Sequence, residues 1–435
     1  MSKTTRTQRL ARLARGIQRV EGRLRVTQQL GSRLGWARLG VFLLTLAGAY
    51  GLGQVNGAAG AAALVVGLAA FGVLVGRHRR VKAIHERYAG WLSIQRTHVA
   101  RAELDWAHIP KLPNFTARVD HPFETDLDIG GEHSLHQLLD TSATLQGSAR
   151  LRDWLLATAP DGTAVKARHG LLDEMPVAFA DQLALRARLT YEGRGKLDTR
   201  PLLAWMAAEG DGGVSGRYVA TLAALCVITA VLFVLRQAAG ISPYFAISFV
   251  IYFGLSLMRL RSAVGVLNEA FTVQEMVSSL YGVFSYLERH SWARQPQMQA
   301  LTQPFHNADR PSRALRRLRL IVGAASLRNN YLVWGTLNAI MPWDMFTTYQ
   351  MGQQRRKLAR LLPGWVEVWA ELEALAALRL FAYLNPDYTR PIITREGMVM
   401  AARQLGHPLI DHGQRVCNDF VMDTTRVTMI TGSNM

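Results

Sequence analysis

The last residues of the chain have the types and the order that begin a phosphate-binding loop. Strand-favouring residues 427–430 run through Thr431 into Gly432. A phosphate-binding loop needs a strand, then a glycine-opened turn with inward-pointing amides, then a lysine and a hydroxyl residue that start a helix. The loop residues this predicts are Gly432, Ser433, Asn434 and Met435. The lysine and the hydroxyl residue would then fall beyond Met435, and an ordinary strand-ending turn is the alternative.

A run of cations forms a second candidate for binding chemistry. Its members are Arg313, Arg316, Arg317 and Arg319. Guanidinium groups bind phosphate oxygens, so the cluster fits the backbone of double-stranded DNA or anionic lipid headgroups. The net charge of +18 favours a polyanionic partner of either kind.

Metal-ligating residues are sparse. His133 and His136 lie three residues apart on a predicted helix, with no third ligand nearby. Cys226 and Cys417 are far apart in the sequence and have no second Cys or His at ligand spacing. The sequence therefore indicates neither a metal site nor a disulfide framework, and a reducing compartment fits best.

Two helical hairpins of membrane length surround the first soluble region. Residues 39–76 contain no charged side chain and are interrupted only at 53–57, and residues 218–235 and 241–257 form a second pair. A hydrocarbon core of about 30 Å needs about 20 apolar residues per helix, and these arms approach that length. Two buried hairpins in a soluble core are the alternative.

The distribution of cations predicts the orientation of both hairpins. The flanking cations are Arg33, Arg38, Arg77, Arg79, Arg80 and Lys82 for the first hairpin and Arg217, Arg259 and Arg261 for the second. The outer turn of the second hairpin carries only Arg236. Positive flanks stay in the cytoplasm, so we expect a multi-pass protein of the cytoplasmic (inner) membrane with its soluble parts in the cytoplasm.

The first 35 residues predict a basic amphipathic helix. Leu10, Leu13 and Ile17 recur at helical spacing among several arginines. We expect an interfacial helix whose Arg9 and Arg12 face lipid phosphates. A cleaved transit peptide and a DNA-binding arm are alternatives.

The other soluble segments are predicted to be helical. Short helices are expected over 126–208, one long helix over 259–290 and two more over 311–384. Residues 331–351 are apolar enough for a fifth span, but Pro342 and the central Asp344 favour a buried soluble helix.

Several of these motifs together resemble the MutS family of mismatch repair ATPases. Residues 431–435 resemble the TGPNM that opens the family's P-loop, with Ser433 where the family has Pro. Four upstream segments also resemble parts of the family. Gly406, His407, Pro408 and Leu409 resemble its GRHPL-like segment, and Asn418 and Asp419 resemble its N-D pair. Residues 388–392 resemble its link into the ATPase domain, and Glu373, Ala374 and Leu375 resemble the helix before that link.

A second region is similar to the family's core and lever domain. It begins near Asp126 and Asp128 and continues through a leucine-rich stretch into Gly147, which opens a G-x-x-x-L-R-x-W-L helix. The resemblance covers about 120–208 and 311–435. Residues 1–119 resemble none of the family's mismatch-reading domains, and the second hairpin interrupts the lever region. These departures put mismatch recognition in doubt.

The resemblance implies ATP and Mg²⁺ as cofactors of the complete protein and a homodimer as its partner state. It places Val416 and Asn418 near the adenine, with Arg415 in place of a usual aromatic residue, and gives His407 a structural role. Since the loop lysine and the Mg²⁺-binding hydroxyl are not in the chain, we expect this fragment not to hydrolyse ATP. A membrane-bound helical scaffold without mismatch recognition is the alternative function.

The predicted fold is mainly α, with two transmembrane hairpins, a MutS-like helical core and lever domain, and the start of an α/β P-loop (ABC-type) ATPase domain. The predicted boundaries are 1–35 for the basic helix, 36–80 for the first hairpin, 81–119 for a juxtamembrane helix and linker, 120–215 for the first part of the core, 216–260 for the second hairpin, 261–385 for the second part, and 386–435 for the ATPase start.

Overall fold

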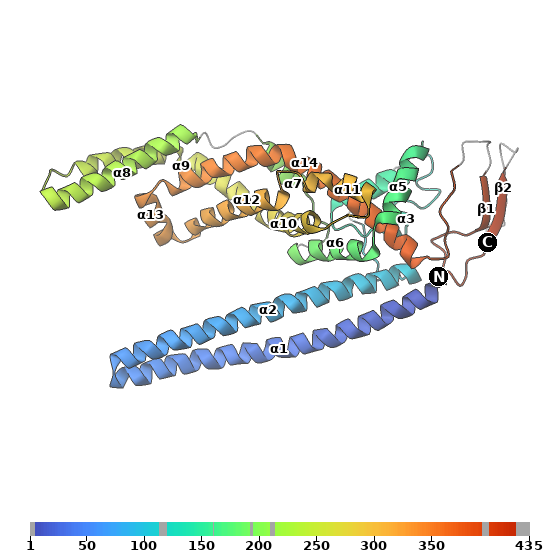
Figure 1. Ribbon diagram of the computed structural model, residues 1–435, viewed down its shortest axis with the longest axis horizontal. Helices are drawn as coiled ribbons and strands as arrows, with labels where there is room; N and C mark the ends of the chain where they lie inside the picture. Colours follow the sequence, from blue (N-terminus) through green and yellow to red (C-terminus); the bar gives the residue numbers. More distant parts are fainter. Residues whose placement is uncertain are drawn as a thin grey trace. The chain divides into compact units, whose positions relative to one another are not determined.

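The computed structural model describes residues 5–112, 120–159, 161–191, 195–208, 214–393 and 400–422. These residues are mainly helical, as predicted, and their β structure consists of one two-stranded sheet and an isolated bridge between Thr144 and Leu197 (Figure 1). The chain divides into two compact units. One contains Met1–Asp140, Leu155–Val165 and Leu378–Met435, and the other contains Thr141–Trp154 and Lys166–Ala377.

Two long antiparallel helices dominate the first unit. Helix α1 spans Arg6–Val55 and helix α2 spans Gly57–Glu103, and they lie side by side along their length (Figure 1). Between them only Asn56 leaves helical geometry, and its side chain accepts a hydrogen bond from the amide of Ala58 (2.9 Å). The predicted turn over 53–57 is therefore a one-residue break with its own helix cap.

Small residues allow α1 and α2 to approach closely at their apolar ends. A Cβ at Gly60 would lie 2.7 Å from the Cα of Gly53, and a Cβ at Gly67 would overlap the side chain of Thr45. This close contact of small residues is typical of helix pairs in membranes.

The basic N-terminal segment continues directly into the apolar arm of α1. It packs on α2, with Glu21 paired to Arg96 (2.7 Å) and its first-turn guanidinium groups bound to protein: Arg6 donates to the carbonyl of Ala102 and Arg9 to that of Tyr383. Arg9 therefore contacts a protein carbonyl here, whereas the sequence predicted contact with lipid phosphate.

The rest of the first unit is built around the end of α2. Helix α3, Leu135–Leu139, begins at Ser134, whose hydroxyl accepts from the amide of Gln137 (3.2 Å). Buried Arg101 donates to the carbonyls of Gln137 (2.7 Å) and Asp140 (2.5 Å), which satisfies carbonyl groups at the end of that helix. Strands β1, Met400–Leu405, and β2, Asn418–Met422, complete the unit.

The described part of the second unit is mainly helical. Its elements are α4 (Leu145–Leu155), α5 (Gly162–Glu174), α6 (Val177–Thr190), α7 (Arg200–Ala207), α8 (Gly216–Ala239), α9 (Tyr244–Thr272), α10 (Gln274–Arg289), α11 (Pro296–Thr302), η1 (Gln303–Phe305), α12 (Pro311–Ala325), η2 (Ser326–Asn329), α13 (Tyr331–Ile340) and α14 (Trp343–Leu384). The ends of α4, α5 and α14 extend into the first unit.

An aromatic core holds α10 and α14 together. The ring of Phe284 packs edge-on against Trp369 (5.7 Å between centroids) and Phe305 (5.1 Å). Trp369 and Leu372, three residues apart on α14, are fully buried. The single long helix predicted over 259–290 is divided at Val273 into α9 and α10.

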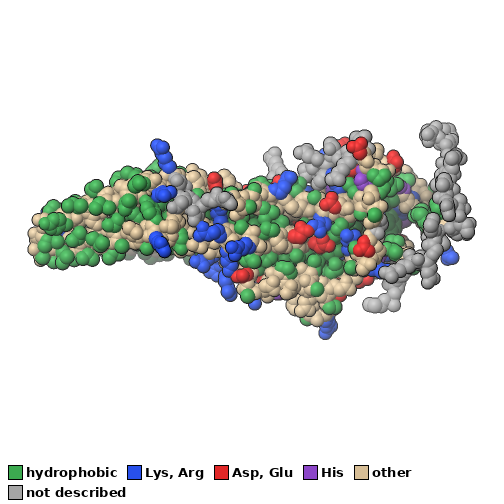
Figure 2. Space-filling view, turned by 90° about the horizontal axis from the view of Figure 1, so that it is seen from above, with side chains coloured by type: hydrophobic (Ala, Val, Ile, Leu, Met, Phe, Trp, Pro, Cys, Tyr) green, Lys and Arg blue, Asp and Glu red, His purple; other side chains and the backbone are tan. Residues whose placement is uncertain are grey.

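Four helices, α1, α2, α8 and α9, are long and apolar enough to cross a membrane. Their apolar side chains point outward; Val231 of α8 is 52% exposed and Val250 of α9 is 67% exposed. Figure 2 shows hydrophobic side chains covering the α8–α9 end, with Lys and Arg gathered beside its base. Outward apolar surface on this scale favours a lipid environment.

Residues 331–351 differ from both structures expected for them. The segment breaks at Met341 and Pro342, so α13 is a separate helix of 10 residues and α14 begins at Trp343. None of the α13 side chains is buried, whereas Asp344 just after the break is 2% exposed. The segment is therefore neither a fifth span nor one buried helix.

Candidate functional site

The antiparallel pair of β1 and β2 carries two of the predicted motifs. Met400 pairs with Met422, Ala402 with Phe420, and Leu405 with Asn418, with an irregularity between Ala402 and Leu405. Gln404 lies in this irregularity with φ of 51°, and its amide donates to the carboxylate of Asp419 (2.8 Å). The N-D pair expected before the P-loop strand thus shapes the hairpin through its aspartate.

The segment joining the strands closes tightly onto its own base. A Cβ at Gly406 would lie 2.7 Å from both the Cδ of Arg415 and the Sγ of Cys417, so a larger residue there would displace these side chains. His407 Nδ1 accepts from the amide of Leu409 (3.3 Å), and its carbonyl accepts from Arg415 (3.4 Å). His407 therefore organises the turn, in line with its expected structural role.

Arg415 packs on an aromatic ring from the segment that precedes the hairpin. Its guanidinium lies over the ring of Tyr388, 5.1 Å from the centroid, and donates to the Tyr388 hydroxyl. Tyr388 in turn packs edge-on against Phe381 (5.7 Å) near the end of α14. The sequence did not indicate this pair, because a Tyr and an Arg 27 residues apart have no local signature.

A small basic cavity lies beside this pair. It has a volume of about 20 Å³, room for one water molecule, and its polar lining includes Arg6, Arg101, Asn385, His412 and Arg415. The described residues that line it include no carboxylate. Desolvation and the positive charges of Arg6 and Arg415 lower the pKa of His412.

The predicted nucleotide contacts divide into a described and an undescribed part. Val416 is 79% exposed, and Asn418, at the start of β2, is also exposed. Both follow Arg415 closely in the sequence. Gly432, Ser433, Asn434 and Met435 lie outside the described residues.

The arginine cluster belongs to α12 in the second unit, whereas the hairpin belongs to the first. Arg313, Arg316, Arg317 and Arg319 are all exposed. Arg319 lies over the ring of Tyr281 (4.9 Å), and Arg317 reaches Gln350 (3.4 Å). The other two guanidinium groups point away from the core of this unit, on the same helix face.

A contact between two resembling motifs was not predicted. The carboxylate of Glu373 in α14 accepts from the amides of Ala143 (3.0 Å) and Thr144 (3.3 Å) and from the Thr144 hydroxyl. It fills the space where a Cβ of Gly147 would lie. The sequence held both motifs, and only the fold shows that they meet.

An ion pair lies about one turn away on the same two helices. Arg150 of α4 binds Glu371 (2.9 Å) and Glu367 of α14. Burial raises the pKa of Glu371, and the charge of Arg150 opposes that shift. The α4–α14 contact is therefore held largely by carboxylates of α14.

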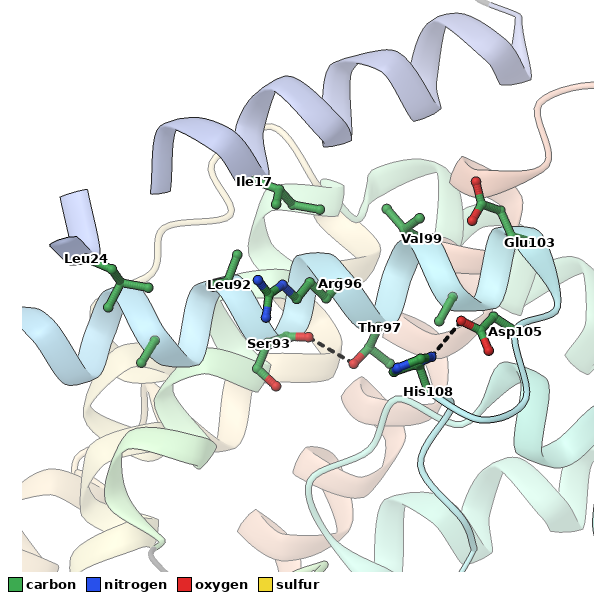
Figure 3. A pocket seen from close by; sticks show the side chains of 12 residues that line it. Ile17, Leu24, Leu92, Ser93, Arg96, Thr97, Val99, Glu103, Asp105 and His108 are labelled. Atoms are coloured by element: carbon green, nitrogen blue, oxygen red, sulfur yellow. Dashed lines mark hydrogen bonds and ion pairs between the residues drawn. The ribbon is translucent and has the colours of Figure 1, made fainter. Parts of the chain in front are cut away.

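A larger groove of about 510 Å³ lies between the basic ends of α1 and α2. Figure 3 shows Ile17 and Leu24 of α1 facing Leu92 and Val99 of α2. At one end His108 pairs with Asp105 (2.6 Å). No predicted site residue lines this groove.

The two histidines considered as metal ligands lie in different surroundings. His136 is fully buried, 3.8 Å from the carboxylate of Asp140, whereas His133 packs its ring against Trp106 (4.9 Å). Among the described residues, no group of three or more His, Cys, Asp or Glu is placed to hold a metal ion.

We compared the chain with models of known families, with curated proteins and with solved structures, and none of the three comparisons gives a match.

Proposed function

We propose that this chain is the membrane-anchored portion of a MutS-like P-loop ATPase whose phosphate loop begins at Gly432. One observation carries the proposal: the His407 segment and the Asn418–Asp419 pair, which resemble separate motifs of that family, lie in one hairpin. Asp419 bonds the amide of Gln404 in the opposite strand (2.8 Å). β2 leads along the chain directly toward the predicted loop strand.

ATP is the proposed ligand of the completed loop. Val416 and Asn418 would border the base, and Arg415 would stack on it, because a guanidinium plane has a second face when one is covered by Tyr388. The amides from Gly432 onward would bind the phosphates. In such a loop the Mg²⁺-binding hydroxyl follows the lysine, so both fall after Met435.

The contact of Glu373 with the start of α4 supplies a mechanical connection for this function. α14 carries Glu373 and continues along the chain toward the hairpin. A nucleotide-dependent shift of α14 would therefore act on α4 through a charged, closely packed contact. Two copies forming a homodimer are part of the proposal.

The membrane anchor consists of α1, α2, α8 and α9. Cations flank the inner ends of both hairpins, and this supports the proposal that the helical units and the ATPase start lie on the cytoplasmic side of the inner membrane.

The first test is the reading frame after Met435. Glycine, lysine and Ser or Thr at the second, third and fourth codons would support the loop, and their absence would overturn it. The second test is equilibrium binding of a fluorescent ATP analogue by the protein that includes those codons, reconstituted in nanodiscs. Arg415→Ala should weaken binding by about threefold to tenfold through loss of stacking, while Arg294→Gln, an exposed cation on the second unit, should not.

A membrane-bound helical scaffold is the second candidate, favoured by the predominance of helix in the described residues. It predicts no nucleotide binding by the protein with the longer reading frame. DNA binding is a separate part of the first candidate: tighter binding of mispaired than of paired duplex at physiological salt would support mismatch recognition, and equal affinities would remove it.

A further inference from the structure

Helix α13 exposes apolar side chains although it lies next to a membrane-type hairpin. Tyr331 is 85% exposed, Leu332 83% and Ile340 68%. With 10 residues and a rise of about 1.5 Å per residue, α13 is about 15 Å long, half of the hydrocarbon thickness. It is too short to span a membrane and too apolar for a helix surrounded by water.

A hydrogen bond and a packing cluster attach this helix to the apolar part of α9. The hydroxyl of Tyr252 donates to the carbonyl of Asn338. Tyr252 precedes Arg259, at the cytoplasmic end of the apolar stretch, by seven residues, which is about 10 Å along the helix. Met345, in the first turn of α14, packs with Tyr252 and with Leu222 of α8. The end of α13 therefore lies at the depth of the membrane-spanning residues of α9.

The chain enters and leaves this depth from the same side. Before α13, Leu315 and Leu318 of α12 are fully buried in the second unit, and after it Trp369 of α14 is fully buried in the same unit. The Nε1–H of Trp343 donates to the carbonyl of Ala324 (3.1 Å), which closes the base of the excursion.

The exposed face of α12 changes character along its length. Arg313 and Arg316 occupy it in the first half, and Leu320, 64% exposed, follows on the same side; Leu327, 42% exposed, lies just after the helix in η2. Cations followed by outward leucines are the pattern of a helix that passes from water through the headgroups toward the acyl chains.

Three hydrogen bonds link polar groups of the tip within the segment, which lowers the cost of an apolar environment, although Asp344 Oδ1 makes no hydrogen bond to the described residues. The Nε1–H of Trp334 donates to the carboxylate of Asp344 (2.8 Å), and the amide of Asp344 donates to the side-chain oxygen of Asn338 (3.2 Å). The side-chain amide of Asn338 donates to the carbonyl of Trp334 (3.1 Å). These bonds join α13 to α14 across the break at Pro342.

We propose that α13 is a re-entrant helix that inserts into the cytoplasmic leaflet beside α8 and α9, and that the arginines of α12 bind the phosphates of anionic lipids around it. The inference rests on the membrane anchoring proposed above and adds an element and a lipid class that the anchoring alone does not imply.

Spin-label accessibility tests the insertion. Single cysteines replace Leu332, Ile340, Val250 and Gln299 in turn, in the Cys226→Ala, Cys417→Ser background of the full chain in nanodiscs. Val250 is the reference for lipid and the exposed Gln299 of α11 the reference for water. We expect the labels at positions 332 and 340 to collide more often with oxygen, which dissolves in lipid, than with a water-soluble nickel chelate. The label at position 250 should show the same preference.

Two outcomes would overturn the insertion and are distinguishable. If the labels at positions 332 and 340 are as accessible to water as the label at 299, while the label at 250 is in lipid, the membrane anchor is supported and the re-entrant helix is wrong. If 250 also behaves like 299, the membrane anchoring falls together with it.

Selectivity for spin-labelled phosphatidylglycerol over phosphatidylcholine tests the lipid site. The double variant Arg313→Gln, Arg316→Gln should lower this selectivity, by a factor on the order of five for each cation removed. The control pair Arg294→Gln with Arg360→Gln, exposed on the same unit, should leave it unchanged. Equal effects of the two pairs on lipid selectivity would overturn the lipid site. If the change of Arg313 and Arg316 instead abolishes binding of duplex DNA and leaves lipid selectivity unchanged, the lipid site is also overturned and the cluster is assigned to DNA.

Discussion

The carboxylate of Glu373 occupies the space beside the Cα of Gly147. It also accepts hydrogen bonds from the amide and the hydroxyl of Thr144, the residue before α4, and the Thr144 oxygen accepts from the amide of Gly147 (2.9 Å). A negative charge at a helix N-terminus is favourable because the free amides and the helix dipole are positive there. Thr144 thus caps α4, and a distant helix supplies the carboxylate that holds this capping residue.

Gly147→Ala should destabilise the second unit, because the new methyl group overlaps the Glu373 carboxylate. We expect a loss of about 1–3 kcal/mol in the free energy of unfolding, the range for overpacked sites. Thermal denaturation in detergent, followed by near-UV circular dichroism, measures it. Gly364→Ala is the matched control: it lies inside α14, has no neighbour within 4 Å of its Cβ position, and should be stabilising.

The double variant identifies the cause. Combining Gly147→Ala with Glu373→Ala should cost less than the sum of the two single changes, since the overlap with the carboxylate disappears and only the contact with the Cβ of residue 373, at 2.8 Å, remains. Additive effects would show that Gly147 is sensitive for another reason.

Asp198 should make stability depend on acid pH. Hydrogen bonds from Arg200 lower the pKa of Asp198 from its ordinary value of 3.8 to about 2. A lowered folded-state pKa contributes stability that is present above pH 4 and is lost as the pH falls toward 2. Asp198→Asn should therefore lower the denaturation temperature at pH 5 and have no such effect near pH 2.

The partner change provides the control for this pH dependence. Arg200→Gln should reproduce the effect of Asp198→Asn, and the double variant should be no worse than either. A constant difference between variant and wild type across pH 2–5 would contradict the assignment.

Gly406→Ala should loosen the hairpin that leads toward the predicted phosphate loop. The added Cβ meets the side chains of Arg415 and Cys417 at 2.7 Å, so Arg415 must move away from Tyr388. We expect faster amide hydrogen exchange over 400–422. Gly413→Ala, whose nearest neighbour is Asp411 Oδ1 at 3.2 Å, should have a smaller effect. Unchanged exchange in Gly406→Ala would contradict the tight turn.

Trp334→Phe should weaken the tip formed by α13 and α14. It keeps an aromatic ring but removes the N–H that binds the buried Asp344, a loss of about 1–3 kcal/mol for an unpaired buried acceptor. Trp36→Phe, at a position 72% exposed on α1, is the control for replacing tryptophan. Denaturation temperatures in nanodiscs compare the two, and equal small shifts would show that the indole bond contributes nothing.

Elements with a local cause were predictable. Charge-free runs gave the four long apolar helices, because hydropathy over about 20 residues is a property of neighbouring side chains. Elements that depend on contacts with other parts of the chain were not predictable in the same way. The break at Met341 has a local cause in Pro342, but the packing of α13 depends on the bonds of Asn338 and Asp344, which no periodicity reveals.

The sequence by itself determined the mainly helical fold, the apolar helical hairpins and the motifs carried by the β1–β2 hairpin. Helix formation and turn chemistry depend on nearby residues, so they can be read from the sequence. Only the tertiary structure decided that Glu373 binds the capping residue of α4 beside Gly147, that Arg415 stacks on Tyr388, and that α13 is attached to Tyr252 of α9. These contacts join residues far apart in the chain, and packing selects them only after the helices exist.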